Sequence, residues 1–212
     1  MQLKTRAIVL QKTPFKETSY IVKFMTESHG VISAIVQGAR KNNSKYLSHF
    51  ELANCLEIIY IKKKTDLHLI TDSSILIFNE QSNHSYFQLL SIQTVLEIYT
   101  QLIISDADSH ELFLLLIKYL EYIQQVKSNH LLIIWRFLIR LLKMLGFEIE
   151  QTDTEIINNW LAIIKNASKY IQSDNILNKS CILMNQFILN SFSRNLHINI
   201  YSKTLKIYEE SL

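Results

Sequence analysis

The spacing of apolar residues changes once along this chain, at about residue 79, and that change limits the folds it can adopt. From Leu3 to Phe78, short apolar runs rich in Val and Ile are separated by turn-forming residues, a pattern typical of β-strands. From Asn79 onward, apolar residues recur at helical spacing. Because the strands precede the helices, we expect an α+β protein, with a strand domain at 1–80 and a helical domain at 81–212.

The first part predicts five strands, enough to close a small barrel. Thr13-Pro14, Ser28-His29-Gly30 and the segment 62–66 are the expected turns. At Gly30 we expect a tight hairpin, in which glycine supplies a positive φ that other residues avoid. The strands are predicted at residues 7–10, 19–24, 31–36, 56–61 and 67–70.

The second part predicts a series of helices, with Gly146 as the residue just past the end of one of them. In that helix, every residue from Leu131 to Lys143 is apolar except Arg136, Arg140 and Lys143. We therefore expect a nearly buried helix that exposes one basic stripe. The helices are predicted at residues 85–104, 111–126, 131–145, 155–171, 179–193 and 202–210.

Positive charge is concentrated in the strand domain. Residues 1–80 carry 11 Lys and Arg against 7 Asp and Glu, whereas residues 81–212 carry 11 against 12, so the net charge of +3 comes from the first part. A basic surface on the strand domain is compatible with a nucleic-acid partner. Ordinary solvated lysines explain the same numbers, so charge alone leaves both interpretations open.

Cysteines and apolar runs indicate a soluble, cytoplasmic protein. Cys55 and Cys181 lie far apart and form no CxxC motif, so we expect reduced, buried thiols and neither a disulfide nor a zinc site. The apolar core of the N-terminus is too short for a signal peptide, and no apolar run approaches the roughly 20 residues of a membrane span.

Motifs of nucleotide-binding and hydrolytic enzymes are absent, which favours a protein that is not an enzyme and needs no cofactor. The most site-like acidic cluster, residues 105–111, could ligate a metal ion through oxygen atoms, but it lacks the Gly and the distal Glu of a calcium loop. We predict instead that Asp108 or Ser109 caps the following helix, with Glu111 in its first turn, and that no metal is bound.

Several short motifs follow one another in a characteristic order: 13–19 (TPFKETS), 24–30 (FMTESHG), 38–41 (GARK) with Ser44 and Lys45, 47–50 (LSHF), 109–113 (SHELF) and 136–147 (RFLIRLLKMLGF). Their order and spacing resemble the RecO family of bacterial recombination mediators. The segment 151–180 contains no cysteine, whereas many members carry a four-cysteine zinc site after a Leu-Gly-Phe or Leu-Gly-Tyr element, so metal binding is not carried over. The last third of the chain matches the family poorly.

This resemblance implies an N-terminal OB-fold barrel and a helical C-terminal domain. It also implies a DNA repair and recombination mediator that binds single- and double-stranded DNA, anneals complementary strands and helps to load a recombinase. The implied protein partners are RecR and the acidic, apolar C-terminal tail of single-stranded-DNA-binding protein. Such a protein remodels protein–DNA complexes without making or breaking a bond.

Binding to DNA requires cations along a groove and exposed aromatic rings on which bases can stack. The lysine run at 62–64 could equally be a solvated hairpin turn that protects an edge strand. The aromatic residues Tyr20, Phe24, Tyr46 and Tyr60 could stack on bases or fill the barrel core. Our candidate DNA ligands are Arg6 on the first strand, Arg40, Lys41 and Lys45 in the loop after Gly38, and Lys62, Lys63 and Lys64 in the next hairpin.

The basic stripe of the helical domain is the candidate site for a protein partner. Arg136, Arg140 and Lys143 share one helix face and suit a ligand with carboxylates and an apolar anchor. They could instead keep a buried helix soluble, or pair with Glu97, Glu111 or Glu121. Two other functions stay open: an adaptor that binds only proteins, and a hydrolase, which would need convergent carboxylates in a pocket.

Overall fold

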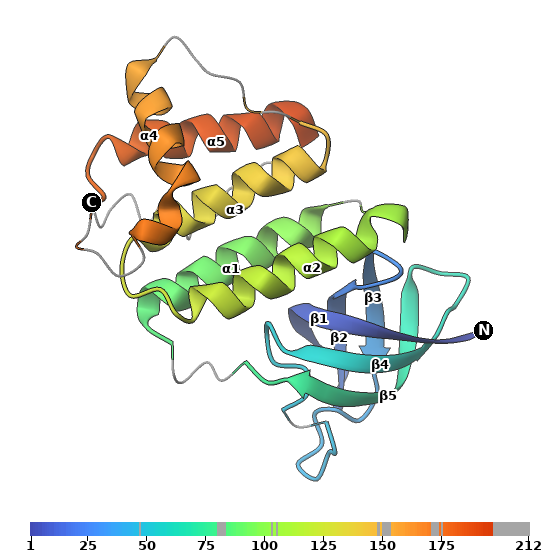
Figure 1. Cartoon of the computed structure of the whole chain (residues 1–212). Helices are drawn as coiled ribbons and strands as arrows, with labels where there is room; N and C mark the ends of the chain where they lie inside the picture. Colours follow the sequence, from blue (N-terminus) through green and yellow to red (C-terminus); the bar gives the residue numbers. More distant parts are fainter. Residues whose placement is uncertain are drawn as a thin grey trace. The chain divides into compact units, whose positions relative to one another are not determined.

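The computed structural model describes residues 1–46, 48–79, 84–102, 104, 106–147, 149, 154–170, 174 and 176–196 (Figure 1). The chain divides into two compact units. Residues 1–83 and 96–116 form the first, and residues 84–95 with 117–212 form the second, so α1 (Tyr86–Gln101) and α2 (Asp106–Ile123) each contribute to both. The helix predicted at 202–210 lies outside the described residues.

The first unit contains a closed barrel whose strands are neighbours in the order β1-β2-β3-β5-β4 (Figure 1). β1 pairs antiparallel with both β2 and β4, and β3 closes the barrel by pairing parallel with β5. This arrangement is the OB-fold, so the predicted fold class is confirmed. The strands are β1 (Gln2–Phe15), β2 (Ser19–Thr26), β3 (Val31–Val36), β4 (Cys55–Ile61) and β5 (Leu67–Ile77).

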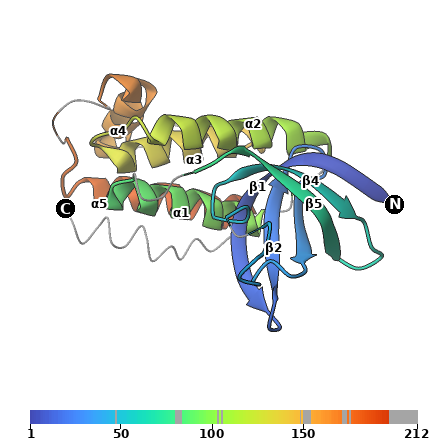
Figure 2. The same cartoon turned by 90° about the horizontal axis from the view of Figure 1, so that it is seen from below.

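The turn predicted at Thr13-Pro14 is wrong. Pro14 lies within β1, opposite Tyr20 of β2, and the turn is formed by residues 16–18, where Lys16 has a φ of 51°. The ladder between β1 and β4 ends at Ile8, so the later part of β1 pairs with β2 alone. Proline is tolerated in a strand with one open edge because its missing N–H breaks no ladder there. The β1–β2 hairpin consequently extends past the barrel (Figure 2).

Gly30 forms the β2–β3 turn as predicted, with a φ of +59°. The N–H and hydroxyl of Thr26 both donate to the carbonyl oxygen of Gly30, each at 2.8 Å. A Cβ atom at this position would lie 2.4 Å from the carbonyl oxygen of Ile104. The turn therefore needs glycine for two reasons, its backbone conformation and the close approach of the residue 104 backbone.

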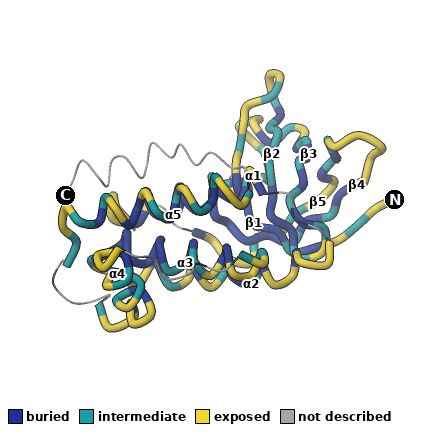
Figure 3. The backbone as a smooth tube through the Cα atoms, turned by 90° about the horizontal axis from the view of Figure 1, so that it is seen from above, coloured by how far each residue is buried: buried dark blue, intermediate teal, exposed yellow. Residues whose placement is uncertain are grey.

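Apolar side chains of the strands fill the barrel, while the loop tips are exposed (Figure 3). The sequence predicted either a base-stacking or a core role for Phe24 and Tyr60. Both are buried in the barrel, with 0% and 1% of their surfaces exposed. Tyr20 and Tyr46 only partly enter this core. The distinction matters because only a ring at the surface can meet a nucleobase.

α2 begins at Asp106, before the position that sequence predicts, so neither Asp108 nor Ser109 caps it. The Ser109 hydroxyl instead donates to two carbonyl oxygens, that of Asp106 at 2.8 Å and that of Glu27 in the barrel at 2.9 Å. The Ser109 hydroxyl, which was expected to accept a hydrogen bond from a backbone N–H at the helix start, thus serves as a donor to these two carbonyl oxygens. Ser105 lies outside the described residues, and the described ones include no group of three residues suited to a metal ion.

The second unit is helical and is organised around α3 (His130–Met144). The indole Nε1 of Trp135 donates to Asn185 of α5 (Cys181–Leu196) at 3.3 Å, and its ring packs edge-on against Trp160 of α4 (Glu155–Lys165). A short 3-10 helix, η2 (Ala167–Lys169), follows α4. No helix in the described ranges is both long and apolar enough to cross a membrane.

α3 ends where the sequence predicts. The N–H of Gly146 donates to the carbonyl of Lys143 at 3.1 Å, and the N–H of Phe147 donates to that of Leu142 at 2.9 Å. These two bonds form a Schellman motif, in which Gly146, with a φ of +88°, is the residue after the cap. The motif stops the helix at Met144, one residue beyond Lys143, the last member of its basic stripe.

Candidate nucleic-acid interface

Apart from Arg6, the candidate DNA ligands lie in two loops of the barrel. OB-folds bind oligonucleotides on the β2–β3 face together with the β1–β2 and β4–β5 loops. Arg40, Lys41 and Lys45 lie in the long β3–β4 loop (residues 37–54), and Arg6 lies within β1. The lysine run occupies the β4–β5 loop, as Lys62, Lys63 and Lys64.

Arg40 is held against the turn of the β1–β2 hairpin. Its backbone N–H donates to the carbonyl of Thr18 at 2.9 Å, and its guanidinium Nη1 donates to the carbonyl of Lys16 at 2.7 Å. Its Cζ atom lies 5.9 Å from the ring centroid of Tyr20. The buried side chain of Ala39 anchors the chain just before it. Arg40 is thus an exposed cation with a restricted position.

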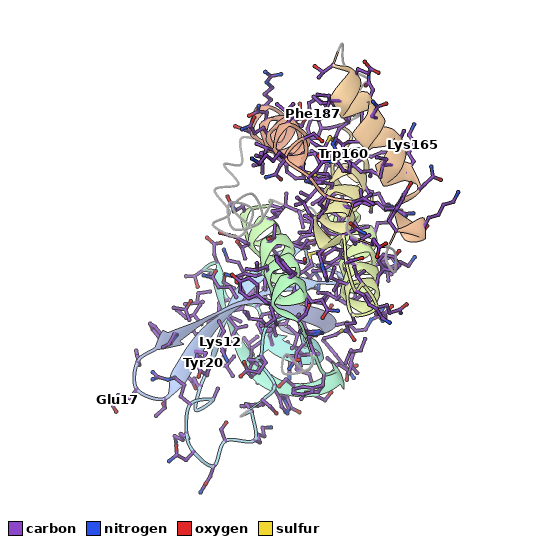
Figure 4. The ribbon with its side chains drawn as sticks, turned by 90° about the vertical axis from the view of Figure 1, so that its left-hand side faces the viewer. Lys12, Glu17, Tyr20, Trp160, Lys165 and Phe187 are labelled. Atoms are coloured by element: carbon purple, nitrogen blue, oxygen red, sulfur yellow. The ribbon has the colours of Figure 1, made fainter. Side chains whose placement is uncertain are left out.

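Two further lysines lie beside this arginine, and the sequence reasoning missed both. Lys12 Nζ lies 5.2 Å from the ring centroid of Tyr20 and 2.7 Å from Oε1 of Glu51. Lys16 Nζ lies 5.4 Å from the ring centroid of Phe15. We call Lys12, Lys16, Tyr20 and Arg40 the Arg40 corner. Figure 4 shows Lys12 and Tyr20 together, with Glu17 farther out on the hairpin.

Lys45 is exposed but paired. Its Nζ lies 2.7 Å from Oδ1 of Asp72 on β5 and 4.8 Å from the ring centroid of Tyr46. The hydrogen bond between the two side chains raises the pKa of Lys45 and lowers the pKa of Asp72. The hydroxyl of Tyr46 donates to the carbonyl of Thr71 at 3.2 Å, which ties the loop to β5. Lys45 can therefore contact a phosphate only if its Nζ also keeps, or first breaks, its ion pair with the carboxylate of Asp72.

Arg6 is the candidate least available to DNA. Its guanidinium donates through Nε to Oε2 of Glu27 at 2.6 Å and through Nη2 to the other carboxylate oxygen. Hydrogen bonding raises the pKa of Arg6 and lowers the pKa of Glu27. The same carboxylate lies 3.2 Å from Nδ1 of His110, and Arg6 also lies over the ring of Phe113. Arg6 thus joins the barrel to the start of α2 within the first unit.

The lysine run is exposed, and none of its three side chains forms an ion pair in the part of the chain that the structure describes. The backbone of this loop is held by hydrogen bonds at Lys62 and Lys63. The N–H of Lys62 donates to the carbonyl of Met1 at 2.9 Å, and that of Lys63 reaches Nδ1 of His68 at 3.5 Å. Burial, followed by the charge of Lys62, lowers the pKa of His68. The long, exposed side chains of these lysines thus carry three positive charges on a turn whose backbone is held in place.

The second unit contains a basic cavity of about 530 Å³ between α3 and α4. Arg136, Arg140 and Lys143 line it, as does Lys165 of α4, which the sequence reasoning missed and Figure 4 labels. Among the residues that the structure describes, no carboxylate lines the cavity and none of these cations forms an ion pair. The apolar part of the lining consists of Ile139, Ile149, Leu161, Ala162 and Ile164.

Comparisons with known proteins point to one family over most of the chain. Residues 1–78 match the family model described as recombination protein O N terminal, and residues 83–156 match recombination protein O C terminal. Proteins named DNA repair protein RecO from Prosthecochloris aestuarii and Chlorobium limicola are 32% and 31% identical over 71% and 70% of this chain. In both cases the match covers 57% of the relative, so the chain spans little more than half their length.

Proposed function

The chain belongs to the RecO family, and from that premise we propose that it is a cytoplasmic DNA repair and recombination protein whose barrel binds DNA. The observation that carries this proposal is the Arg40 corner with its neighbour Lys41. Arg40 and Lys41 are exposed and have no carboxylate partner among the described residues, while the fold holds their loop in place. Cations held in this way can replace the counterions of a phosphate backbone.

Binding of this kind is independent of sequence, because phosphates carry no base information. It would serve single and double strands alike, as strand annealing requires. In this proposal the protein brings strands together and helps to load a recombinase, together with RecR, and it neither breaks a bond nor uses a cofactor.

The test is fluorescence-anisotropy titration of labelled single-stranded DNA at two salt concentrations. The double variant Arg40→Ala/Lys41→Ala should bind more weakly and with a smaller salt dependence, by about 0.7 in log–log slope for each lost phosphate contact. Lys118→Ala/Lys179→Ala is the control, since it removes the same charge from the helical unit. Equal binding by the two double variants, or wild-type binding that salt does not weaken, would contradict the proposal.

A second candidate function rests on the basic cavity. Four cations and an apolar lining, with no carboxylate among the described lining residues, suit a peptide with acidic residues and an apolar end, such as the C-terminal tail of single-stranded-DNA-binding protein. Arg140→Glu should abolish binding of such a peptide, and Lys179→Glu should not. A peptide that binds Arg140→Glu as well as the wild type would exclude this cavity.

The tests of these two candidate functions also distinguish a third possibility, an adaptor that binds only proteins. An adaptor would bind the acidic peptide yet show no affinity for DNA even at low salt. The carboxylates that already pair with Lys12, Lys45 and Arg6 are the feature that favours it, because each removes charge from the barrel surface.

A further inference from the structure

Among the candidate DNA ligands that form no ion pair with a described residue, Arg40 is distinguished by its geometry. A guanidinium is flat, and this one is fixed at two places: Nη1 donates to the carbonyl of Lys16, and Cζ lies over the ring of Tyr20. A lysine in the same position would offer the same charge without a plane. A hydrogen bond and an aromatic contact thus fix the orientation of this group, although its positive charge would act without either.

We propose that the Arg40 guanidinium, supported by Tyr20, is a stacking platform for one unpaired nucleobase. This inference rests on the proposed DNA binding and deepens it, because it adds to the phosphate contacts, which single and double strands share, one contact that only an unpaired base can make. Unpaired bases stack on aromatic rings and on guanidinium planes, whereas bases within a duplex are already stacked and cannot reach such a platform. Lys12 and Lys16, which flank Tyr20 on the same hairpin, are placed to hold the phosphates on either side of that base.

Three probes separate the stacking of a base from the binding of phosphates. They are a labelled oligothymidylate, an abasic oligomer with the same number of phosphates, and a duplex of the same length. The variant is Arg40→Lys, which keeps the charge and removes the plane. It should bind oligothymidylate about tenfold more weakly than the wild type, within the range expected for one lost base stack, and should bind the abasic oligomer and the duplex unchanged.

Tyr20 supplies a second, independent variant pair. Tyr20→Phe keeps a ring beneath the guanidinium and should retain the preference for oligothymidylate over the abasic oligomer. Tyr20→Leu keeps an apolar side chain at the rim of the barrel core but removes the ring, and should reduce that preference. Circular dichroism spectra that match the wild type establish that each variant is folded, and Arg40→Lys carries the test alone if the Leu variant is not.

Arg40→Lys that binds all three probes as the wild type does would overturn the inference, since Arg40 would then act only as a charge. Equal weakening toward oligothymidylate and the abasic oligomer would overturn it as well, because the guanidinium would then hold a phosphate. In both cases the proposed DNA binding would stand. If the wild type bound none of the probes at low salt, the proposed function would fail and the inference with it.

Discussion

Gly30 provides the strictest test of how the barrel is joined to residues 96–116, because substitution by alanine has two separable costs. A left-handed conformation costs a non-glycine residue about 1–2 kcal/mol. The added Cβ would also lie 2.4 Å from the carbonyl oxygen of Ile104, well inside van der Waals contact, so the turn or that backbone must move. Forced overpacking typically costs about 1–3 kcal/mol more.

Gly38 is the matched control in the same unit. Its φ is +70°, and the nearest atom to an added Cβ would be Lys41 Cδ at 3.9 Å, an ordinary contact. Gly38→Ala should therefore show the conformational cost alone, and Gly30→Ala should exceed it by about 1–3 kcal/mol. Trp135 and Trp160 both lie in the second unit, so tryptophan fluorescence does not report on the barrel.

The assay is native-state hydrogen exchange of barrel peptides, in which protection falls about tenfold for each 1.4 kcal/mol lost from the opening free energy. Gly30→Ala should lower protection in β2, β3 and residues 96–116 together, because the strain lies where they meet. Equal losses for the two alanine variants would refute the steric part of this reasoning. A loss confined to the turn would show that the contact with Ile104 does not couple these segments.

Three further predictions concern charge. The hydrogen bond from Arg6 holds the pKa of Glu27 below its usual 4.5, so the stability that this carboxylate contributes is present above about pH 4.5 and is lost on acidification. Glu27→Gln should therefore weaken the hydrogen-exchange protection of the barrel at pH 7 and make that protection less sensitive to acid. Burial lowers the pKa of His130 below 6.5, so urea midpoints followed by tryptophan fluorescence should fall between pH 7 and 5, and His130→Gln should remove that slope. Asp72→Asn should tighten DNA binding by about two- to fivefold in anisotropy titrations at low salt, because it releases Lys45 from an exposed pair.

The sequence was sufficient for the features that depend on local pattern. Alternation of apolar residues predicted every strand of the barrel, and the positive φ of Gly30 and the end of α3 at Gly146 followed from glycine chemistry. The Thr13-Pro14 turn was wrong for a nonlocal reason. Proline argues against a strand only when both edges are paired, and whether β4 extends alongside β1 at that point cannot be read from the residues near Pro14.

The candidate site depended even more on partners distant in sequence. Arg6 looks like Arg40 in the sequence, but Glu27 lies opposite Arg6, whereas Arg40 meets only a backbone carbonyl and an aromatic ring. The three cations of α3 could be placed on one face from their spacing alone. That α4 adds Lys165 to the same cavity depends on tertiary packing.

The ion pairs of the barrel do not all withhold their cations from DNA to the same degree. An exposed pair is worth about 0–1 kcal/mol, so a phosphate can replace its carboxylate at little cost, whereas a desolvated, bidentate pair resists exchange. The carboxylates of Asp72 and Glu51 have 54% and 39% of their side-chain surfaces exposed, against 19% for Glu27. Lys45 and Lys12 can therefore exchange partners as DNA approaches, while Arg6 stays with Glu27. The exchangeable cations Lys12 and Lys45, together with the cations of the β1–β2 turn, the β3–β4 loop and the β4–β5 loop that form no ion pair with a described residue, thus carry the charge left for the proposed DNA binding.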